Sequence, residues 1–283
     1  MRGIFSKRRW VGGLAIVTLG LASYAQQGQS YRGFDRNEYP GDASLPELRK
    51  HFSYAGYWLT NPPGATTNGW TGKRRILLKY GFGFVVLANG REEARIEAAR
   101  VATHLTPMAQ GQVDGRAAVA AAKGERFPAG TIVFLDQEEG GRLTEDQAAY
   151  IKGWVESVAE GGFGPGVYGS GQPVSEGGGK TITTAEDIRS RMASHFYRKK
   201  LALWVYQDAC PPSNGCTLKS PALGTSGTPG AVVWQYAQSP RRREITVACA
   251  KSYALDGNCY VPELPGLHLD LNVSDSADPS RGR

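Results

Sequence analysis

Cysteine and histidine are scarce in this sequence, with four of each among 283 residues. No two cysteines have the CxxC spacing, and no histidine lies close to a cysteine along the chain. Because structural zinc sites are built from clustered Cys and His ligands, we do not expect a metal site.

A hydrophobic run long enough to cross a bilayer is missing from the N-terminus. The apolar stretch Trp10–Leu21 has 12 residues, against about 20 in a membrane-spanning helix. It follows the basic pair Arg8-Arg9 and precedes the small-x-small motif Ser23-Tyr24-Ala25. This pattern predicts a signal peptide over residues 1–25 and a secreted or periplasmic protein. An uncleaved membrane anchor and a twin-arginine signal are the alternatives.

A strong excess of charge is also absent from the part of the chain that is expected to fold. The net charge of +7 falls to +3 without residues 1–25, since 29 Lys and Arg then face 26 Asp and Glu. This weak balance does not favour a nucleic-acid partner. The run Arg241-Arg242-Arg243 beside Pro240 is typical of a solvated loop.

The apolar segments of the remaining chain predict strands that alternate with helices. Most are apolar throughout, as in strands that are buried on both faces. The eight expected strands are Tyr31–Arg36, Tyr54–Leu59, Phe82–Ala88, Thr131–Glu138, Gly166–Ser170, Leu201–Gln207, Ala231–Tyr236 and Leu267–Val273. Residues 26–273 therefore predict a single (β/α)8 barrel of the TIM type, an α/β fold with a parallel sheet. The polar residues 274–283 are expected to be a disordered tail.

Four segments between these strands have helical patterns. Thr144 and Thr184 are each followed three residues later by a side chain that can complete a capping box, which predicts helices to about Ala159 and Lys199. Residues 91–105 and 116–123 are also expected to be helical. The connections 208–230 and 237–266 show no clear helix, which predicts irregular loops in the C-terminal third.

All four cysteines lie in these irregular loops, at Cys210, Cys216, Cys249 and Cys259. Their even number in a chain with an export signal predicts two disulfides. Three pairings are possible, and the short spacings favour Cys210–Cys216 and Cys249–Cys259.

Two carboxylates end the fourth expected strand. Asp136 and Glu138 share one of its faces because strand side chains alternate, and the active site of such a barrel lies at the carboxyl ends of the strands. Carboxyl groups about 6 to 7 Å apart perturb each other's ionisation. For glycosidic cleavage we expect Glu138 to be the acid and Asp136 the stabilising carboxylate. A helix cap or a salt bridge at the rim is the alternative.

Other strand ends carry residues that are expected to complete the site. Asp35 and Asp270 add two carboxylates at the mouth of the barrel. The expected substrate-binding residues are Tyr168, Trp204, Gln207, Trp234, Gln235, Tyr236 and Asn272. Aromatic faces stack on sugar rings, although packing in the core is the alternative for the aromatic members of this set.

Six short motifs resemble, in order, those of glycoside hydrolase family 25 lysozymes. They are Gly33-Phe34-Asp35, Phe134-Leu135-Asp136-Gln137-Glu138, Gly166-Val167-Tyr168-Gly169-Ser170, Leu203-Trp204-Val205, Val233-Trp234-Gln235-Tyr236 and Leu269-Asp270-Leu271-Asn272. The sequence is more similar still to the relatives grouped as the glycoside-hydrolase-like domain of unknown function 1906. The resemblance implies an acidic site of Asp35, Asp136, Glu138 and Asp270 with Glu138 as proton donor. It also implies peptidoglycan as the first substrate to consider, and it implies no metal or organic cofactor.

The sequence departs from the lysozymes at the end of the second strand, Tyr57–Pro63, and in the Gly-rich segment Glu176–Lys180. Such loops shape the substrate site, so two functions follow from the motifs. The first is hydrolysis of glycosidic bonds in peptidoglycan or a related cell-envelope polysaccharide. The alternative is a catalytically inactive barrel that binds cell-wall glycan. In either case the protein is expected to be a monomer, and a surface for binding another protein is a third hypothesis without a motif of its own.

Overall fold

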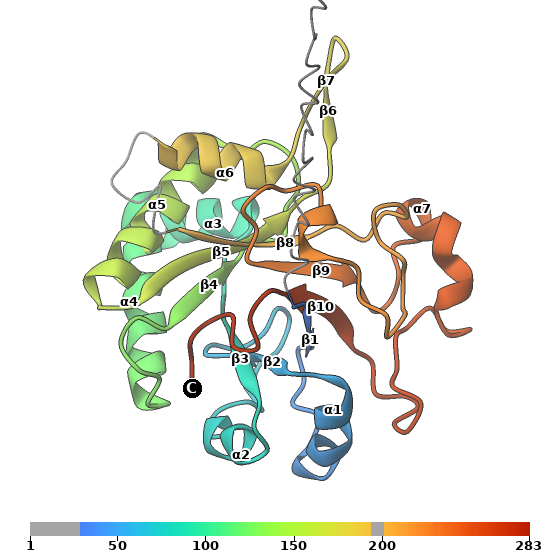
Figure 1. The fold of residues 1–283 in the computed structure, drawn as a ribbon. Coiled ribbons are helices and arrows are strands. Elements are labelled where there is room, and N and C mark those ends of the chain that lie inside the picture. Colours follow the sequence, from blue (N-terminus) through green and yellow to red (C-terminus); the bar gives the residue numbers. More distant parts are fainter. Residues whose placement is uncertain (1–28, 194–200) are drawn as a thin grey trace, which may run out of the picture.

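Eight strands close into a barrel, and each starts and ends within three residues of an expected strand (Figure 1). The computed structural model describes residues 29–193 and 201–283. The predicted signal peptide and the end of the helix that was expected to reach Lys199 lie outside these residues. The barrel strands are β1 (Tyr31–Asp35), β2 (Tyr54–Trp58), β3 (Gly83–Asn89), β4 (Ile132–Asp136), β5 (Gly164–Ser170), β8 (Ala202–Tyr206), β9 (Val233–Ala237) and β10 (Asp270–Ser274).

The last strand corrects the expectation of a parallel sheet. Within the barrel, β1, β2, β3, β4, β5, β8 and β9 pair in parallel, whereas β10 is antiparallel to both of its neighbours, β9 and β1. A parallel pair needs a crossover back to the other end of the barrel, usually through a helix. The connection after β9 holds only the short helices α7 (Arg243–Thr246) and η4 (Val247–Ser252) and re-enters the barrel from the same end. The first residue of β10, Asp270, therefore lies where the other strands end.

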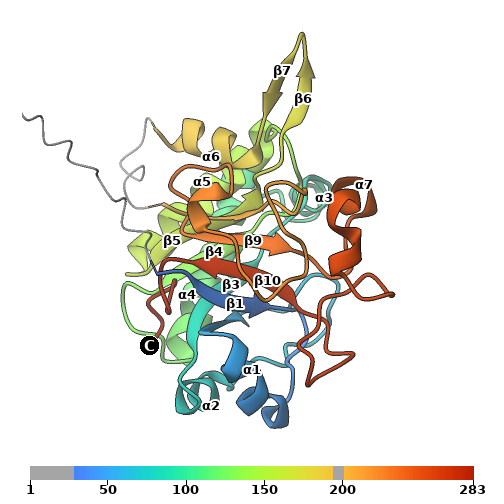
Figure 2. The same cartoon turned by 45° about the vertical axis from the view of Figure 1, so that its right-hand side comes forward.

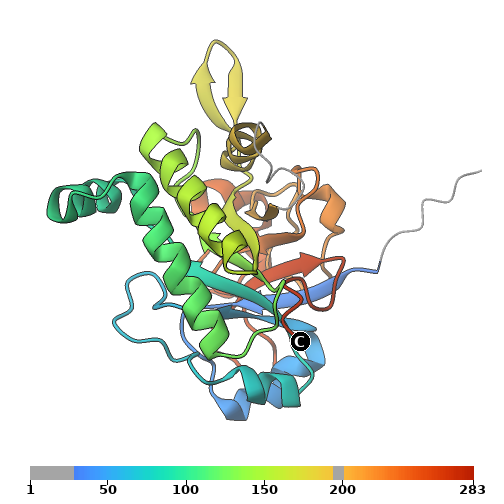
Figure 3. The ribbon, with the colours of Figure 1, turned by 90° about the vertical axis from the view of Figure 1, so that its left-hand side faces the viewer.

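The helices lie outside the barrel strands, and α4 and α5 run side by side along them (Figure 3). The longer helices are α1 (Leu45–His51), α2 (Arg74–Lys79), α3 (Glu93–Thr103), α4 (Pro107–Gly124), α5 (Glu145–Glu160) and α6 (Thr184–Ala193). Gly111 and Gly153 let α4 and α5 approach closely, because a Cβ on either would lie about 2 Å from a carbonyl oxygen of the other helix. No helix in the described ranges is both long and apolar enough to cross a membrane.

One of the two expected capping boxes is confirmed, and the other is displaced by one residue. Thr144 caps α5 and exchanges hydrogen bonds with Gln147, as predicted. At α6 the box joins Thr183 and Glu186 instead. Thr184 is the first residue of the helix, and its hydroxyl donates to the carbonyl of Gly141. Thr184 is fully buried and its hydroxyl is used in this bond, so the residue before it makes the cap.

The C-terminal residues are packed against the barrel, which contradicts the expected disordered tail. Ser280 is fully buried, accepts a hydrogen bond from the backbone of Ile132 and donates its own backbone N–H to Phe84. Asp278 accepts from the backbone N–H of Phe84 at 2.9 Å. The polar character of this segment satisfies unpaired backbone groups at the start of β3 and β4. The polar residues of this segment therefore form hydrogen bonds with the end of the barrel, and their polarity did not mean that the segment is exposed to solvent.

Two disulfides join the connections 208–230 and 237–266, which we call the disulfide-linked loops. Cys210 pairs with Cys249 and Cys216 with Cys259, with Cα–Cα distances of 5.8 and 5.4 Å. The pairing expected from short spacing is wrong. The two loops follow the neighbouring strands β8 and β9, so they leave the same end of the barrel and lie against each other (Figure 2). A separate hairpin of β6 (Val174–Gly177) and β7 (Lys180–Ile182) projects beyond the barrel.

Candidate active site

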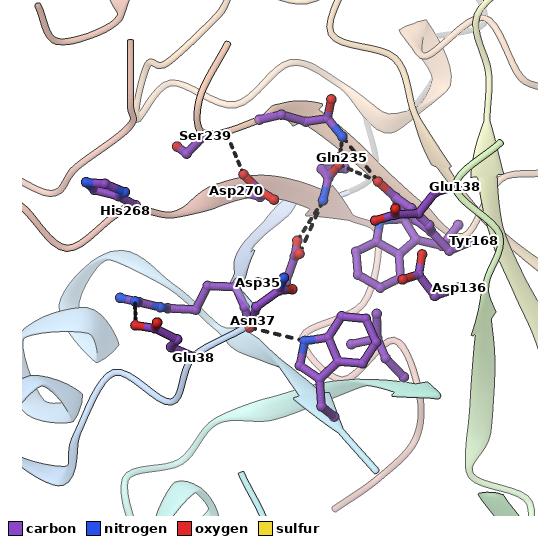
Figure 4. Close-up of a pocket in the computed structure, with 15 residues that line it drawn as sticks. Asp35, Asn37, Glu38, Asp136, Glu138, Tyr168, Gln235, Ser239, His268 and Asp270 are labelled. Atoms are coloured by element: carbon purple, nitrogen blue, oxygen red, sulfur yellow. Dashed lines mark hydrogen bonds and ion pairs between the residues drawn. The ribbon is translucent and has the colours of Figure 1, made fainter. Parts of the chain in front are cut away.

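A cavity of about 400 Å³ opens at the end of the barrel where the parallel strands finish. We call it the main cavity. All four predicted carboxylates line it, together with Tyr168, Trp204 and Gln235 from the predicted binding set. In Figure 4, Asp136 and Glu138 lie near Tyr168 on one side, Asp270 and His268 lie toward the other, and Asp35 lies between. The convergence of distant strand ends makes this cavity the candidate active site.

Asp35 and Asp270 face each other because the antiparallel register of β1 and β10 pairs them directly. Glycine makes room for this arrangement. A Cβ on Gly33 would lie 1.9 Å from the ring of Tyr54, and a Cβ on Gly56 would lie 2.5 Å from the Cβ of Asp35. Neither position tolerates a side chain unless its neighbour moves. The small residues of β1 and β2 thus allow Asp35 to sit deep in the cavity.

Amide side chains hold the carboxylate of Asp35. Gln235 Nε2 donates to both of its oxygens at 3.0 and 3.2 Å, and Asn272 Nδ2 donates to Oδ2 at 2.6 Å. Both amides are themselves oriented, since Gln235 accepts from the hydroxyl of Tyr168 at 2.7 Å and Asn272 accepts from Trp204 Nε1 at 3.0 Å. Each side chain of this network has its donors and acceptors matched, which makes the position of Asp35 well defined.

Burial raises the pKa of Asp35 to about 6, while the hydrogen bonds from Asn272 and Gln235 act in the opposite direction. Its carboxyl group is therefore ionised at pH 7. Burial, and then the charge of Asp35, raise the pKa of Asp270 well above its ordinary value. The backbone N–H of Ser239 donates to Asp270 Oδ1 at 2.5 Å and partly opposes this shift. Both carboxyl groups on this side of the cavity thus have hydrogen-bond donors that favour the anion.

Asp136 and Glu138 have a different environment. Neither carboxyl group accepts a hydrogen bond from the residues that the structure describes. Burial, followed by the charges of Glu138 and Asp35, raises the pKa of Asp136 well above its ordinary value. Burial and then Glu92 raise the pKa of Glu138, which lies at the exposed mouth. The pair therefore keeps a proton to higher pH than free carboxyl groups do.

A second cavity of about 150 Å³ lies on the other side of this carboxylate pair, and we call it the side cavity. Asp136 and Glu138 line both cavities. The remaining lining of the side cavity is Pro63, Gly64, Asn89, Gly90, Arg91, Glu92 and Arg95. An extended ligand would therefore have space on both sides of the pair.

Gln137 and Glu139, the neighbours of Asp136 and Glu138, confirm that the side chains alternate between two faces at the end of β4. The carboxylate of Glu139 turns to the helices, where it accepts from the backbone of Glu93 and from the side chain of Gln147. Gln137 is buried and lies 3.5 Å from the same carboxylate. Neither residue lines the main cavity. Period-two alternation thus separates two carboxylates that face the cavity from one that orders α3 and α5.

Four predicted binding residues, Gln207, Trp234, Tyr236 and Asn272, do not line the cavity, which corrects the sequence prediction. Trp234 and Tyr236 flank Gln235 on β9 and point to the opposite face, where they donate to the carbonyls of Gln207 and Thr217. Gln207 is buried and bonded to Gly171 and Ala209. Neighbouring side chains of a strand point to opposite faces. Since Gln235 faces the cavity, Trp234 and Tyr236 must face away from it. Asn272 acts only through Asp35 and Trp204.

Several lining residues were not expected from the sequence. They are Arg36, Asn37, Glu38, Trp58, Leu87, Gln238, Ser239 and His268. Trp58 ends β2 on the same face as Gly56, so the rule of strand ends could have found it. Gln238, Ser239 and His268 lie in loops that have no periodicity. That such loop residues line the cavity could be recognised only from the folded structure.

Among the described residues, one group of side chains is arranged as metal ligands could be, and it lies away from the main cavity. Glu47 and His51 of α1 and Glu263 bring three ligand atoms within 4.8 Å of one another. None of the three lines the main cavity. His51 already contacts Glu263 at 2.9 Å, and Lys50 contacts Glu47 at 2.6 Å, so ion pairs account for this surface group.

Three solved structures illustrate what this chain is similar to. An uncharacterized protein from B. stearothermophilus has a TM-score of 0.58 and 20% identity, over 86% of this chain and 95% of that one. The bacterial lysozyme from Streptomyces coelicolor has a TM-score of 0.47 and 13% identity, over 86% and 90% of the two chains. A family 25 glycosyl hydrolase from Bacillus anthracis has a TM-score of 0.45 and 14% identity, over 86% and 88%. The first of these shows the shared fold.

No curated protein matches the sequence. A family model does match, over residues 63–246, and this range contains the Asp136 and Glu138 pair, the network residues of β5 to β9 and the first two disulfide cysteines. The match confirms the glycoside-hydrolase-like resemblance that the strand motifs carried. The chain belongs to the Rv2525c-like, glycoside hydrolase-like domain family.

Proposed function

We propose that this protein hydrolyses glycosidic bonds in peptidoglycan or a related cell-envelope polysaccharide. The observation that carries the proposal is the convergence of Asp35, Asp136, Glu138 and Asp270 around one open cavity of about 400 Å³. Glycoside hydrolysis needs a protonated carboxyl group beside a carboxylate that stabilises positive charge on the sugar. Asp35, with a pKa of about 6, lies in the same cavity as carboxyl groups whose raised pKa values keep a proton to higher pH, so the cavity can supply both forms.

Glu138 is the proton donor in this proposal. It lies at the mouth between the two cavities, where the oxygen that links two sugars would pass. Its raised pKa keeps it protonated at higher pH than an ordinary glutamate. Asp136 lies deeper, and its carboxylate stabilises the positive charge as the bond breaks. A cationic transition state favours ionisation of Asp136, so its high pKa in the empty cavity is compatible with this role.

Asp35 and the aromatic residues bind the sugar in this scheme. The ionised Asp35, held by Gln235 and Asn272, accepts hydrogen bonds from sugar hydroxyl or amide groups. Trp58 and Trp204 line the cavity and offer apolar surface to the rings. Trp204 is buried against Phe134, with ring centroids 5.8 Å apart, which gives the floor of the cavity a rigid aromatic surface.

Export of the protein agrees with such a substrate. Disulfides persist in oxidising compartments, and two of them stabilise the loops beside the cavity. We propose that residues 1–25 are the export signal. A polysaccharide of the cell envelope would then be the glycan that the folded protein meets.

The experiment is hydrolysis of purified peptidoglycan, followed by the release of reducing ends. The wild type should release them, and Glu138→Gln should lower the rate about 1000-fold, within the range for loss of a general acid. Glu160→Gln, the same change at an exposed position that ends α5, is the matched control and should keep wild-type activity. Glycan binding without turnover by the wild type would instead support the inactive, glycan-binding barrel.

A further inference from the structure

The second arginine of the run Arg241-Arg242-Arg243 is only partly solvated, whereas the sequence predicted a solvated loop. Arg242 forms an ion pair with Asp208 through Nε and Nη2, and the Asp208 side chain is fully buried. Gln172 Nε2 donates to the same carboxylate at 2.6 Å. By contrast, Arg243 is exposed. A buried carboxylate with these partners needs its cation, because removing one member of such a pair leaves an uncompensated charge.

Arg242 also contacts Tyr206, which forms a hydrogen bond with the segment that follows β4. Its guanidinium carbon lies 4.9 Å from the ring centroid of Tyr206. The hydroxyl of Tyr206 donates to the backbone carbonyl of Glu138 at 3.0 Å. Burial raises the pKa of the Tyr206 phenol, so this hydroxyl remains a neutral donor. An unbroken series of contacts thus runs from Asp208 through Arg242 and Tyr206 to the backbone of Glu138.

Both members of the ion pair belong to the disulfide-linked loops. Asp208 lies two residues before Cys210, and Arg242 lies seven residues before its partner Cys249. The backbone carbonyl of Arg242 accepts hydrogen bonds from the backbone of Ile245 and from both the backbone and hydroxyl of Thr246. The disulfide closes a ring of residues 210–249 that contains Arg242, and Asp208 lies two residues outside this ring. The bridge therefore restricts how far the two charges can separate.

We infer that Arg242 is a positioning residue, which transmits the order of the disulfide-linked loops through Tyr206 to the segment that carries Glu138. The role of this segment in catalysis rests on the proposed function, but the mechanical coupling does not. The segment contains Gly140 and Gly141, and the Cβ position of Gly140 lies 3.6 Å from the Tyr206 hydroxyl. Hydrogen bonds also hold Glu139 and the carbonyl of Gly141, whereas the bond from Tyr206 is made to the backbone of Glu138 itself. Tyr206 is thus well placed to limit its motion.

Two substitutions test the coupling. Tyr206→Phe removes only the hydroxyl that binds the Glu138 carbonyl, and Arg242→Gln removes the cation above the ring. Hydrogen exchange of the backbone amides of residues 138–141, measured on the oxidised full chain, should rise about tenfold in both variants, as for a lost restraint of one hydrogen bond. Tyr260→Phe and Arg243→Gln make the same changes at more exposed positions of these loops and should leave the exchange unchanged.

The kinetic readout separates positioning from general destabilisation. On peptidoglycan, both variants should lower kcat about tenfold with KM within about twofold, because the glycan contacts remain while the acid is less well placed. The double variant should lose no more than Arg242→Gln alone, since the two residues act in series. Equal exchange in wild type, Tyr206→Phe and Arg242→Gln would overturn the inference. Faster exchange in a protein that hydrolyses no glycan would support the coupling and count against the proposed function alone.

Discussion

The two sides of the acidic cavity differ in how their carboxyl groups are held. Asp35 and Asp270 receive hydrogen bonds from Gln235, Asn272 and the backbone of Ser239. Asp136 and Glu138 accept none from the described residues. The hydrogen bonds oppose the rise in pKa that burial causes in Asp35 and Asp270, and no such bonds oppose it in Asp136 and Glu138. In the proposed function this difference separates a carboxylate that binds the sugar from the pair that reacts.

The largest expected effect contrasts one carboxylate from each side. Asp136→Asn should lower kcat/KM on peptidoglycan about 1000-fold, because an amide cannot stabilise the developing cation by its charge. Asp270→Asn should lower it only about tenfold, since the amide oxygen still accepts from Ser239 and the residue is remote from the pair. Steady-state kinetics on the two variants measures the difference. Equal losses of kcat/KM in the two variants would show that the two sides of the cavity do not differ in their roles.

The next effect concerns stability and pH. Because the pKa of Asp35 rises from 3.8 to about 6 on folding, the folded state binds more protons than the unfolded state between these values. The contribution of Asp35 is therefore fully present below pH 4 and is lost as the pH rises through 6, a change of about 3 kcal/mol. The difference in unfolding free energy between the wild type and Asp35→Asn should shift by this amount, in favour of the variant, from pH 3 to pH 8.

Denaturant unfolding of both proteins at the two pH values gives this quantity directly. The lost hydrogen bonds to Gln235 and Asn272 add a cost to the variant that does not depend on pH, so only the change with pH is informative. A constant difference between the proteins would show that Asp35 titrates normally.

A smaller effect should follow from weakening the hydrogen bonds to Asp35. Asn272→Ala removes the 2.6 Å donor to Asp35 and leaves Trp204 Nε1 without its acceptor. The pKa of Asp35 should then rise above about 6, because the bonds that favour the anion are fewer. Carboxyl carbon NMR titration measures it, and we expect activity at pH 7 to fall about tenfold. An unchanged titration would mean that Gln235 alone determines the ionisation of Asp35.

The smallest effect distinguishes the two faces of β9. Trp234→Phe should leave KM for the glycan within about twofold, since this side chain points away from the cavity and bonds to Gln207. Trp58→Phe, the same change inside the cavity, should raise KM severalfold. Initial-rate measurements on the two variants give both KM values. If Trp234→Phe raised KM as much as Trp58→Phe, the outward assignment of Trp234 would be wrong.

The regular part of the fold could be predicted because its signals are local. The apolar runs around Val133 and Val205 mark buried strands, and the Thr144 capping box marks the start of α5. The rule of strand ends then brought Asp35, Asp136 and Glu138 to one cavity. Period-two alternation also identified which of the residues 136 to 139 share a face. On β9 the same alternation joins Trp234 to Tyr236, but it does not tell which face of the strand lines the cavity.

The rest depends on contacts between distant segments. The disulfide pairing depends on two loops meeting above β8 and β9, and the direction of β10 depends on a connection without a crossover helix. The packed C-terminus satisfies backbone groups of Phe84 and Ile132, which are far away in the sequence. The buried ion pair of Arg242 is of the same kind. None of these features has a local pattern, so each required the structure.

The role of Glu138 as the acid can be tested most directly with two substrates that differ only in the leaving group. An aryl glycoside with a strongly acidic phenol departs without protonation, whereas a sugar leaving group in peptidoglycan needs a proton. Glu138→Gln should retain cleavage of the aryl glycoside within about tenfold while losing peptidoglycan hydrolysis, and Asp136→Asn should lose both. Equal loss on both substrates by Glu138→Gln would contradict its assignment as the proton donor.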